Sequence, residues 1–275
     1  MTTLGENVAT TTALVAPWES MARCAGLMVA LKRRHLVVVD DADRPLGLVS
    51  DLDVFRQGAL VGSGDWASTP EGKARAEEVL LPIDVIGLEH DPLDQALDRL
   101  ADSVQDVIVC VDAEGRLVGL LSEHDAMAIV SRRMPERLPL SMLASRTVAT
   151  VGRLEPAIDA LTVMLQDRRR HLVVLDESGK VCGVLSMRDL FANGVADGER
   201  RMVGEVLPGA SVHVAQADHS LRRAATEMAR HQIGCLPVVD EQGRCTQVIT
   251  RTDLLRAYAA WLREHVAVRV EAEPR

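Results

Sequence analysis

The sequence predicts an α+β protein built from four βαββα repeats, which pack in pairs as two modules with pseudo-twofold symmetry. Three observations support this fold class. An internal repeat runs in register through four copies. Each copy alternates helix-type and strand-type apolar patterns. One copy alone is too short to bury a stable core, so the copies are expected to share cores in pairs.

The overall composition excludes several classes of function. Aromatic residues make up 2% of the 275 residues and the formal net charge is −9, which speaks against a nucleic-acid-binding protein. We find no signal peptide and no apolar stretch of membrane-spanning length. The five cysteines lack the spacing of a zinc site or a disulfide framework. We therefore expect a cytoplasmic protein with reduced thiols, no membrane contact and no metal.

The repeat is defined by positions that keep their spacing in all four copies. An apolar run ends in an aspartate, a hydroxyl follows ten residues later, and a second aspartate follows after three more. The first aspartates are Asp40, Asp112, Asp176 and Asp240. The hydroxyl and aspartate pairs are Ser50 and Asp53, Ser122 and Asp125, Ser186 and Asp189, and Thr250 and Asp253. This register predicts one structural unit repeated four times.

Each copy is expected to begin with a short strand and a helix. Apolar residues predict such strands at 85–86, 148–151 and 212–214. In the fourth copy Leu221, Ala224, Ala225 and Met228 then recur at helical spacing.

A strand hairpin and a second helix complete each copy. Continuous apolar runs such as 107–111 predict a strand that is buried on both faces. Turns that contain Gly115, Gly179 or Gly243 lead into a second strand, as a tight hairpin requires. The hydroxyl at the end of that strand begins the closing helix.

These elements place the repeats at 13–57, 77–131, 141–194 and 195–262. A flexible insertion is expected at 58–76, a linker at 132–140, a disordered N-terminus at 1–12 and a tail at 263–275. The first and third copies share the sequence Arg-Arg-His-Leu-Val-Val, which the second and fourth lack. This alternation indicates duplication of a two-copy module, so we expect copies one and two to pair, and copies three and four.

The repeat resembles the CBS domain, whose pairs are called Bateman modules. The apolar strand ending in Asp, the Ser/Thr-x-x-Asp sequence and the glycines Gly47, Gly119 and Gly183 carry the resemblance, and Gln247 replaces the glycine in the fourth copy. The resemblance implies a regulatory protein that binds an adenosine-containing ligand, such as AMP, ADP, ATP or S-adenosylmethionine, and in some members NAD or cyclic dinucleotides. It also implies a homodimer and an effector protein of unknown identity.

The Ser/Thr-x-x-Asp pairs have two interpretations. They fit a helix N-cap with an acid at the third helical position, which any purely structural repeat would use. They also fit a nucleotide site, because a helix N-terminus binds phosphate and a carboxylate accepts hydrogen bonds from ribose hydroxyls. For any one copy the residues leave both interpretations open.

Basic residues enter the first long strand of the odd copies: Arg34, His35, Arg170 and His171. They either stabilise the end of the preceding helix or bind a polyphosphate. The sequence therefore favours a polyphosphate site at the odd copies and favours the fourth copy least.

Catalysis is not expected from this chain, because no nucleophile motif or P-loop occurs and the repeats leave no segment for a catalytic domain. We expect no catalytic residues and no obligatory cofactor. Two alternatives to a ligand sensor stay open: a dimerisation scaffold with vestigial sites, and a thiol-based stress sensor acting through Cys235 or Cys245.

Overall fold

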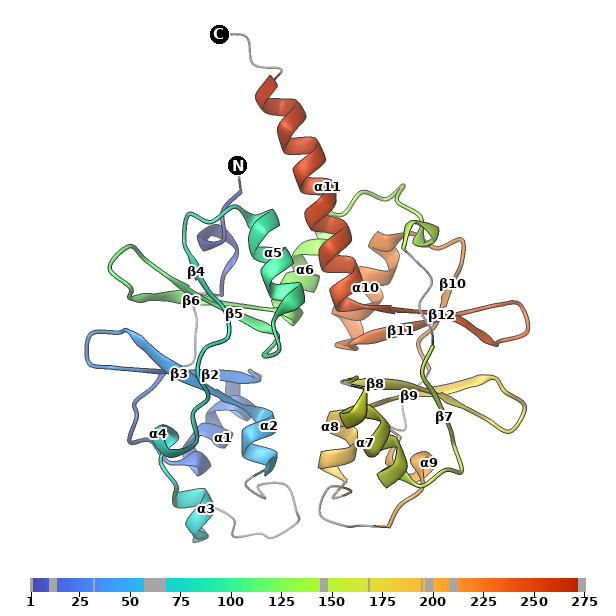
Figure 1. Cartoon of the computed structure of the whole chain (residues 1–275), viewed down its shortest axis with the longest axis horizontal. Helices are drawn as coiled ribbons and strands as arrows, with labels where there is room; N and C mark the ends of the chain where they lie inside the picture. The colour runs from blue at the N-terminus through green and yellow to red at the C-terminus, as the bar shows by residue number, and fades with distance from the viewer. Residues whose placement is uncertain are drawn as a thin grey trace. The chain divides into compact units, whose positions relative to one another are not determined.

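The computed structural model describes residues 2–9, 14–31, 33–56, 68–143, 148–167, 169–193, 195, 200–207 and 212–271. The chain divides into two compact units. Unit 1 consists of Met1–Ala126 and Tyr258–Arg275, and unit 2 of Met127–Ala257. Each unit contains the sheets of two repeats and is described by itself (Figure 1).

Every repeat forms one three-stranded sheet in which the first two strands pair in parallel and the last two antiparallel. Repeat 1 contains β1 (Leu14–Val15), α1 (Met21–Leu31), β2 (His35–Val39), β3 (Pro45–Ser50) and α2 (Asp51–Arg56). Repeat 2 contains β4 (Ile86–Leu88), α5 (Leu93–Asp102), β5 (Val107–Val111), β6 (Leu117–Ser122) and α6 (Glu123–Arg133). Repeat 3 contains β7 (Thr150–Gly152), α7 (Ala157–Gln166), β8 (His171–Leu175), β9 (Val181–Ser186) and α8 (Met187–Ala192). Repeat 4 contains β10 (Ala215–Gln216), α10 (Leu221–His231), β11 (Cys235–Val239), β12 (Cys245–Thr250) and α11 (Arg251–Glu271).

The βαββα order confirms the predicted fold class, although three first strands begin one to three residues later than predicted. Their position is set by parallel pairing with the second strand, as when Ala215 of β10 lies opposite Val238 of β11. A 3-10 helix (Gly5–Asn7) precedes repeat 1. The repeats are connected by the short elements α3 (Pro70–Lys73), α4 (Ala76–Val79), a second 3-10 helix (Leu140–Met142) and α9 (Val203–Val206).

The first aspartate of each repeat forms the hairpin turn. One oxygen of Asp40 accepts hydrogen bonds from the backbone N–H groups of Ala42 (2.9 Å) and Arg44 (2.8 Å). Asp112, Asp176 and Asp240 accept the same pair of bonds in their own turns. These aspartates are therefore explained by turn geometry and are not needed for a binding site.

In unit 1 the sheets of repeats 1 and 2 share a core. Val37, Val39 and Leu48 form one buried cluster with residues of β5 and β6, namely Val107, Val109, Val111 and Leu120. The opposite face of β2 is buried too, because Leu36 and Val38 pack with residues of α1. Figure 1 shows the two hairpins of this unit stacked on each other. A strand buried on both faces must be apolar throughout, which accounts for the unbroken runs in the sequence.

In unit 2 the same arrangement joins repeats 3 and 4. Strand β9 lies against β11, and the N–H of Val181 donates a 3.1 Å hydrogen bond to the carbonyl of Gly243 in the other hairpin. Val174 and Leu185 pack with helices α7 and α9 in a separate buried cluster.

The predicted linker at 132–140 is attached to α10. Arg222 of α10 donates a hydrogen bond to the carbonyl of Ser131 and forms an ion pair with Glu136 at 2.9 Å.

In unit 1 each hairpin is crossed by the segment that leads into the other repeat. A Cβ atom at Gly47 would lie 2.8 Å from the carbonyl oxygen of Leu81, and one at Gly119 would lie 2.7 Å from that of Ala9. Both segments form a β-bridge with the strand that they cross. These two glycines are therefore required by close backbone approach.

In unit 2 the packing of the crossing segments accounts for the replacement of the pattern glycine by Gln247 in the fourth repeat. A Cβ at Gly183 would lie 2.9 Å from the side chain of Leu207, which leads into repeat 4. At the matching position of repeat 4, the Gln247 side chain instead donates to the carbonyl of Leu143 at 3.4 Å, just before repeat 3. The substitution concerns packing of a crossing segment, so it does not by itself indicate a lost ligand site.

Residues 2–9, which were predicted to be disordered, are ordered on repeat 2. The side chain of Leu4 is fully buried, and its N–H donates to the carbonyl of Asp91 at 2.9 Å. The absence of a side chain at Gly87 makes room for Leu4, since a Cβ there would lie 2.5 Å from its Cδ2. The prediction failed because a short polar segment with one apolar anchor has no periodic pattern. Residues 1 and 10–12 lie outside the described residues.

Two other predicted irregular segments contain helix. Residues 58–67 of the predicted insertion lie outside the described residues, but α3 and the start of α4 occupy its second half, and Thr69 caps α3. Helix α11 continues beyond the predicted boundary at 262, and Arg263 forms an ion pair with Asp98 of α5. Within the described ranges, no helix combines the length and apolar character that crossing a bilayer needs.

Candidate functional site

The hydroxyl and aspartate pairs form helix caps in all four repeats. The hydroxyl donates to one carboxylate oxygen, with distances of 2.6 Å in repeats 1 and 2, 2.5 Å in repeat 3 and 2.7 Å in repeat 4. The aspartate N–H donates back to the hydroxyl oxygen at 3.2–3.3 Å. The helix cap predicted by the first interpretation is therefore formed in all four repeats. A ligand could bond only to those lone pairs of each hydroxyl and aspartate that the cap does not use.

In repeat 2 that capacity is taken up by Arg33 of repeat 1. One guanidinium nitrogen of Arg33 lies 3.0 Å and 3.2 Å from the two carboxylate oxygens of Asp125. A ribose hydroxyl would have to compete with this charge-assisted contact.

In repeat 3 the corresponding carboxylate is more open. Asp189 uses Oδ2 for the cap, accepting from the Ser186 hydroxyl and from its N–H at 2.8 Å. Among the residues that the structure describes, none donates a hydrogen bond to its Oδ1. A carboxylate oxygen of this kind has the chemistry to accept a hydrogen bond from the hydroxyl of a sugar.

Three arginines gather near this pair in unit 2. Arg170 precedes β8, Arg188 lies in the first turn of α8, and Arg251 begins α11. Burial, followed by the charges of Arg251 and Arg188, lowers the pKa of Arg170 to about 10. Arg251 is buried and donates to the carbonyls of Ile233 and Gln232 at 3.1 Å each, which fixes its guanidinium. Such a concentration of partly desolvated cations is suited to an anion with several charges.

Unit 1 lacks this cluster although it is built in the same way. The positions that match Arg170, Arg188 and Arg251 in the repeat register are Arg34, Leu52 and Glu123. Glu123 is buried. One cation and one acid replace three cations, so the two units differ sharply in charge at equivalent positions.

The histidines of the two Arg-Arg-His sequences lie opposite the motif serines in the antiparallel strand register, His35 opposite Ser50 and His171 opposite Ser186. The ring of His171 also packs on repeat 4, because a Cβ at Gly234 would lie 2.4 Å from it. This contact gives His171 a packing role inside unit 2.

Sequence reasoning missed Arg188 and Arg251. Both lie within or beside a Ser/Thr-x-x-Asp motif, so comparing the residues next to each motif would have identified them as charges that the other copies lack. Whether they act together could not be known before the topology placed them near Arg170.

The cysteines are protonated thiols at neutral pH. Burial raises the pKa of Cys24 to about 11 and that of Cys110 and Cys235 to about 12, and it also raises the pKa of Cys182 and Cys245. Because the thiolate is the reactive form, these values oppose a thiol sensor based on Cys235 or Cys245.

Four βαββα repeats that share cores in pairs, with a hydroxyl and an aspartate at each closing helix, define a protein of tandem paired modules. The family model for the CBS domain matches residues 19–59, 88–132, 140–195 and 203–260. The chain belongs to the CBS domain family.

Curated relatives share this repeat. The chain is 25% identical over 183 residues to the uncharacterized protein MJ1225 of Methanocaldococcus jannaschii, which covers 62% of this chain and 65% of that protein. It is 23% identical over 277 residues to protein MJ1404 of the same organism, covering 94% and 62%. It is 38% identical over 96 residues to the magnesium transporter MgtE of Thermus thermophilus, covering 35% and 20%. The chain thus spans less than two thirds of the length of each of these relatives.

Solved structures show the same fold. The crystal structure of MJ1225 has a TM-score of 0.74 at 19% identity, covering 93% of this chain and 99% of that one. A conserved protein of Pyrococcus horikoshii has a TM-score of 0.68, also at 19% identity and with the same coverage. At this identity the likeness establishes the fold alone. The class of ligand has to be inferred from the residues of the site.

Proposed function

We propose that the chain is a regulatory protein that binds an adenine nucleotide at repeat 3. The observation that carries this proposal is the arginine cluster of Arg170, Arg188 and Arg251 close to the Ser186 and Asp189 pair. The CBS family supports the class of ligand, and the charge supports the choice of repeat. In this proposal the chain is not itself an enzyme.

Each part of the nucleotide has a partner of suitable chemistry. The guanidinium groups of Arg170 and Arg188 bind phosphate oxygens, since planar N–H donors match them bidentately. The Oδ1 atom of Asp189 accepts a ribose hydroxyl. The adenine packs on apolar strand residues and bonds to their backbone.

The number of cations favours ADP and ATP over AMP and S-adenosylmethionine. Three arginines held near one another repel, and a polyphosphate relieves that repulsion more fully than a monophosphate. S-adenosylmethionine carries a positive sulfur, which the cluster disfavours. The expected order of affinity is therefore ATP and ADP first, then AMP, then S-adenosylmethionine.

Regulation follows if the nucleotide binds one arrangement of the protein more tightly than another. The shift in that equilibrium is limited by the difference between the two affinities. We propose that a cytoplasmic homodimer passes this shift to an effector protein.

A structural role is the second candidate, and specific observations favour it for unit 1. Arg33 already holds Asp125, and Glu123 replaces the buried arginine of unit 2. We propose that unit 1 contributes stability and assembly and that unit 2 senses the ligand.

A thermal-shift panel on the full chain tests the proposal, using AMP, ADP, ATP, S-adenosylmethionine, NAD and cyclic di-AMP. A ligand at a hundred times its dissociation constant should stabilise the folded state by about 2.7 kcal/mol, which raises Tm by about 5 °C or more. We expect ATP and ADP to give the largest rise. If none of the six ligands moves Tm, the sensor is refuted and the scaffold is favoured for the whole chain.

A further inference from the structure

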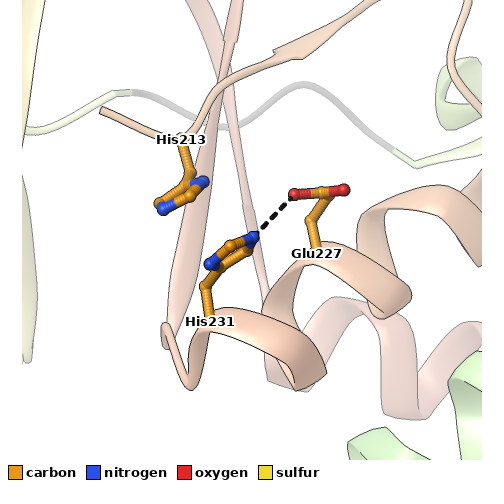
Figure 2. A group of neighbouring side chains, drawn as sticks. All are labelled: His213, Glu227 and His231. Atoms are coloured by element: carbon orange, nitrogen blue, oxygen red, sulfur yellow. Dashed lines mark ion pairs between the residues drawn. The ribbon is translucent and has the colours of Figure 1, made fainter. Parts of the chain in front are cut away.

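Three side chains of repeat 4 that the nucleotide site does not use come together in unit 2. His213 lies just before β10, and Glu227 and His231 lie one turn apart at the end of α10. The Nε2 atom of His231 is 3.4 Å from a carboxylate oxygen of Glu227. The rings of His213 and His231 stack with centroids 3.8 Å apart (Figure 2). One nitrogen or oxygen from each of the three residues falls within 4.8 Å of the others.

From this geometry we infer that His213, Glu227 and His231 form a binding site for a divalent transition-metal ion of the zinc type. Two imidazoles and one carboxylate are a donor set that zinc accepts, with a fourth position left for water or another ligand. Magnesium and calcium prefer oxygen ligands alone, so the two imidazoles select against them.

Binding the ion requires side-chain rotation but no movement of the backbone elements, because the three donor atoms already lie within 4.8 Å of one another. Zinc bonds of about 2.0–2.1 Å in a tetrahedral site place neighbouring donor atoms about 3.3 Å apart. The distance of 3.4 Å from His231 to Glu227 is already close to this value. The imidazole of His213 must rotate out of the stack, because a metal ion lies in the ring plane of each histidine that it binds. All three side chains are partly exposed, so an ion can enter from solvent.

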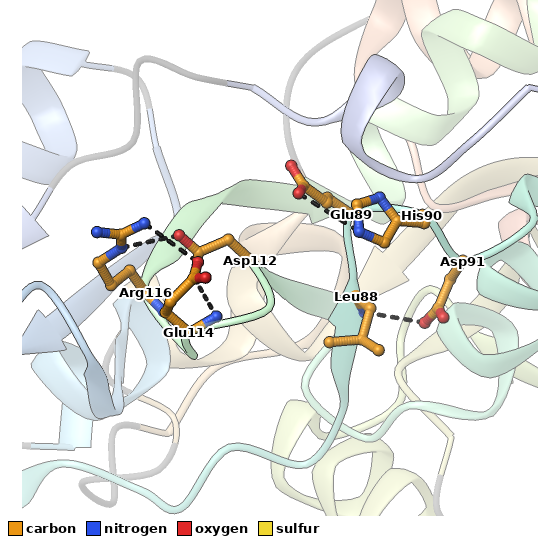
Figure 3. Close-up of polar contacts among 7 residues, drawn as sticks. All are labelled: Leu88, Glu89, His90, Asp91, Asp112, Glu114 and Arg116. Atoms are coloured by element: carbon orange, nitrogen blue, oxygen red, sulfur yellow. Dashed lines mark hydrogen bonds and ion pairs between the residues drawn. The ribbon is translucent and has the colours of Figure 1, made fainter.

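A simpler explanation is an ion pair between residues one turn apart on a helix, with a histidine near the negative end of the helix dipole. Unit 1 offers a comparison, because His90 lies 3.6 Å from Glu89 with no second imidazole in that pair (Figure 3). The ion pair does not account for His213, which comes from a different segment and stacks on the ring of His231.

The sequence predicted no metal, because the cysteine spacing fits no zinc site and no His-Glu-x-x-His motif occurs. The helical pair Glu227 and His231 was visible as an i, i+4 pattern. Its third partner, His213, is separated from it by the loop and strand that begin repeat 4. Only the parallel pairing of β10 with β11 brings His213 beside the end of α10.

Isothermal titration of the reduced full chain with zinc chloride tests this site. We expect one zinc ion per chain, with affinity at least about tenfold weaker in each of His213→Ala, Glu227→Gln and His231→Ala. The matched control His90→Ala removes a histidine beside an acid and should bind zinc as the unmodified chain does. The inference would be overturned if the three site variants bound zinc as tightly as the unmodified chain and the His90→Ala control do. It would also be overturned if the unmodified chain bound no zinc.

A second measurement separates this site from the cysteines. Cobalt bound to the full chain should give the visible absorption of a tetrahedral site without the near-ultraviolet charge-transfer band of thiolate ligands. The visible bands should disappear in His213→Ala, whose folding is checked by its unfolding curve without metal. A thiolate band, or visible bands that persist in that variant, would place the ion elsewhere and refute the site.

Discussion

Replacing Arg170 with alanine should weaken ATP binding by about 10- to 100-fold. Hydrogen bonds to charged groups contribute about 1.5–3 kcal/mol each, and a tenfold change in affinity corresponds to about 1.4 kcal/mol. Arg170 is partly buried next to two other cations, so its contact with a phosphate is poorly screened by water. Isothermal titration of ATP into the full chain measures the change.

The equivalent substitution in unit 1 is the matched control. Arg34→Ala removes the same side chain from the same place in the repeat, but there the positions of Arg188 and Arg251 are taken by Leu52 and Glu123. We expect ATP affinity within about twofold of the unmodified chain. Loss of binding in Arg34→Ala with retention in Arg170→Ala would show that unit 1 holds the ligand.

Replacing Leu48 with alanine should lower the free energy of unfolding of unit 1 by about 2–5 kcal/mol, the usual cost of truncating a buried leucine. Leu48 is 2% exposed and packs between the sheets of repeats 1 and 2. Urea unfolding followed by circular dichroism measures the loss. The effect is large because the cavity would lie in the core that the two repeats share.

Leu46 provides the control, since it lies two residues away in β3 and is 47% exposed. Leu46→Ala should change the free energy of unfolding by less than about 1 kcal/mol, because little apolar surface is returned to water. Similar losses in both variants would mean that the two sheets do not pack against each other at Leu48.

Much of the fold could be predicted because the same sequence pattern occurs in each of the four repeats. The apolar runs, the turn glycines and the capping pairs are all local features, and four copies in register remove the ambiguity of any one. Gly115, Gly179 and Gly243 do adopt positive φ angles of 78–80°, as the hairpin turns require. The resemblance to the CBS domain rested on these positions and is confirmed by the family match.

Contacts between repeats could not be predicted. The repeat pattern indicates the structure within each copy, but it does not indicate which residues of another copy that structure contacts. The pairing of Arg33 with Asp125 joins residues of different copies. The crossing segments that explain Gly47 and Gly119 are also contacts between repeats. The arginine cluster could not be predicted for the same reason. Arg188 and Arg251 belong to different repeats, and only the folded structure brings them close together.

The central claim is that the nucleotide binds at repeat 3, and titration of ATP into Asp189→Asn and Asp125→Asn tests it most directly. Each substitution keeps the size of the side chain and removes its charge, leaving an amide oxygen to support the cap. We expect Asp189→Asn to lose at least about tenfold in affinity, because a charged acceptor of the ribose hydroxyl is lost. Asp125→Asn should bind ATP normally, since Arg33 already holds that carboxylate. Normal binding by Asp189→Asn together with weakened binding by Asp125→Asn would contradict the claim.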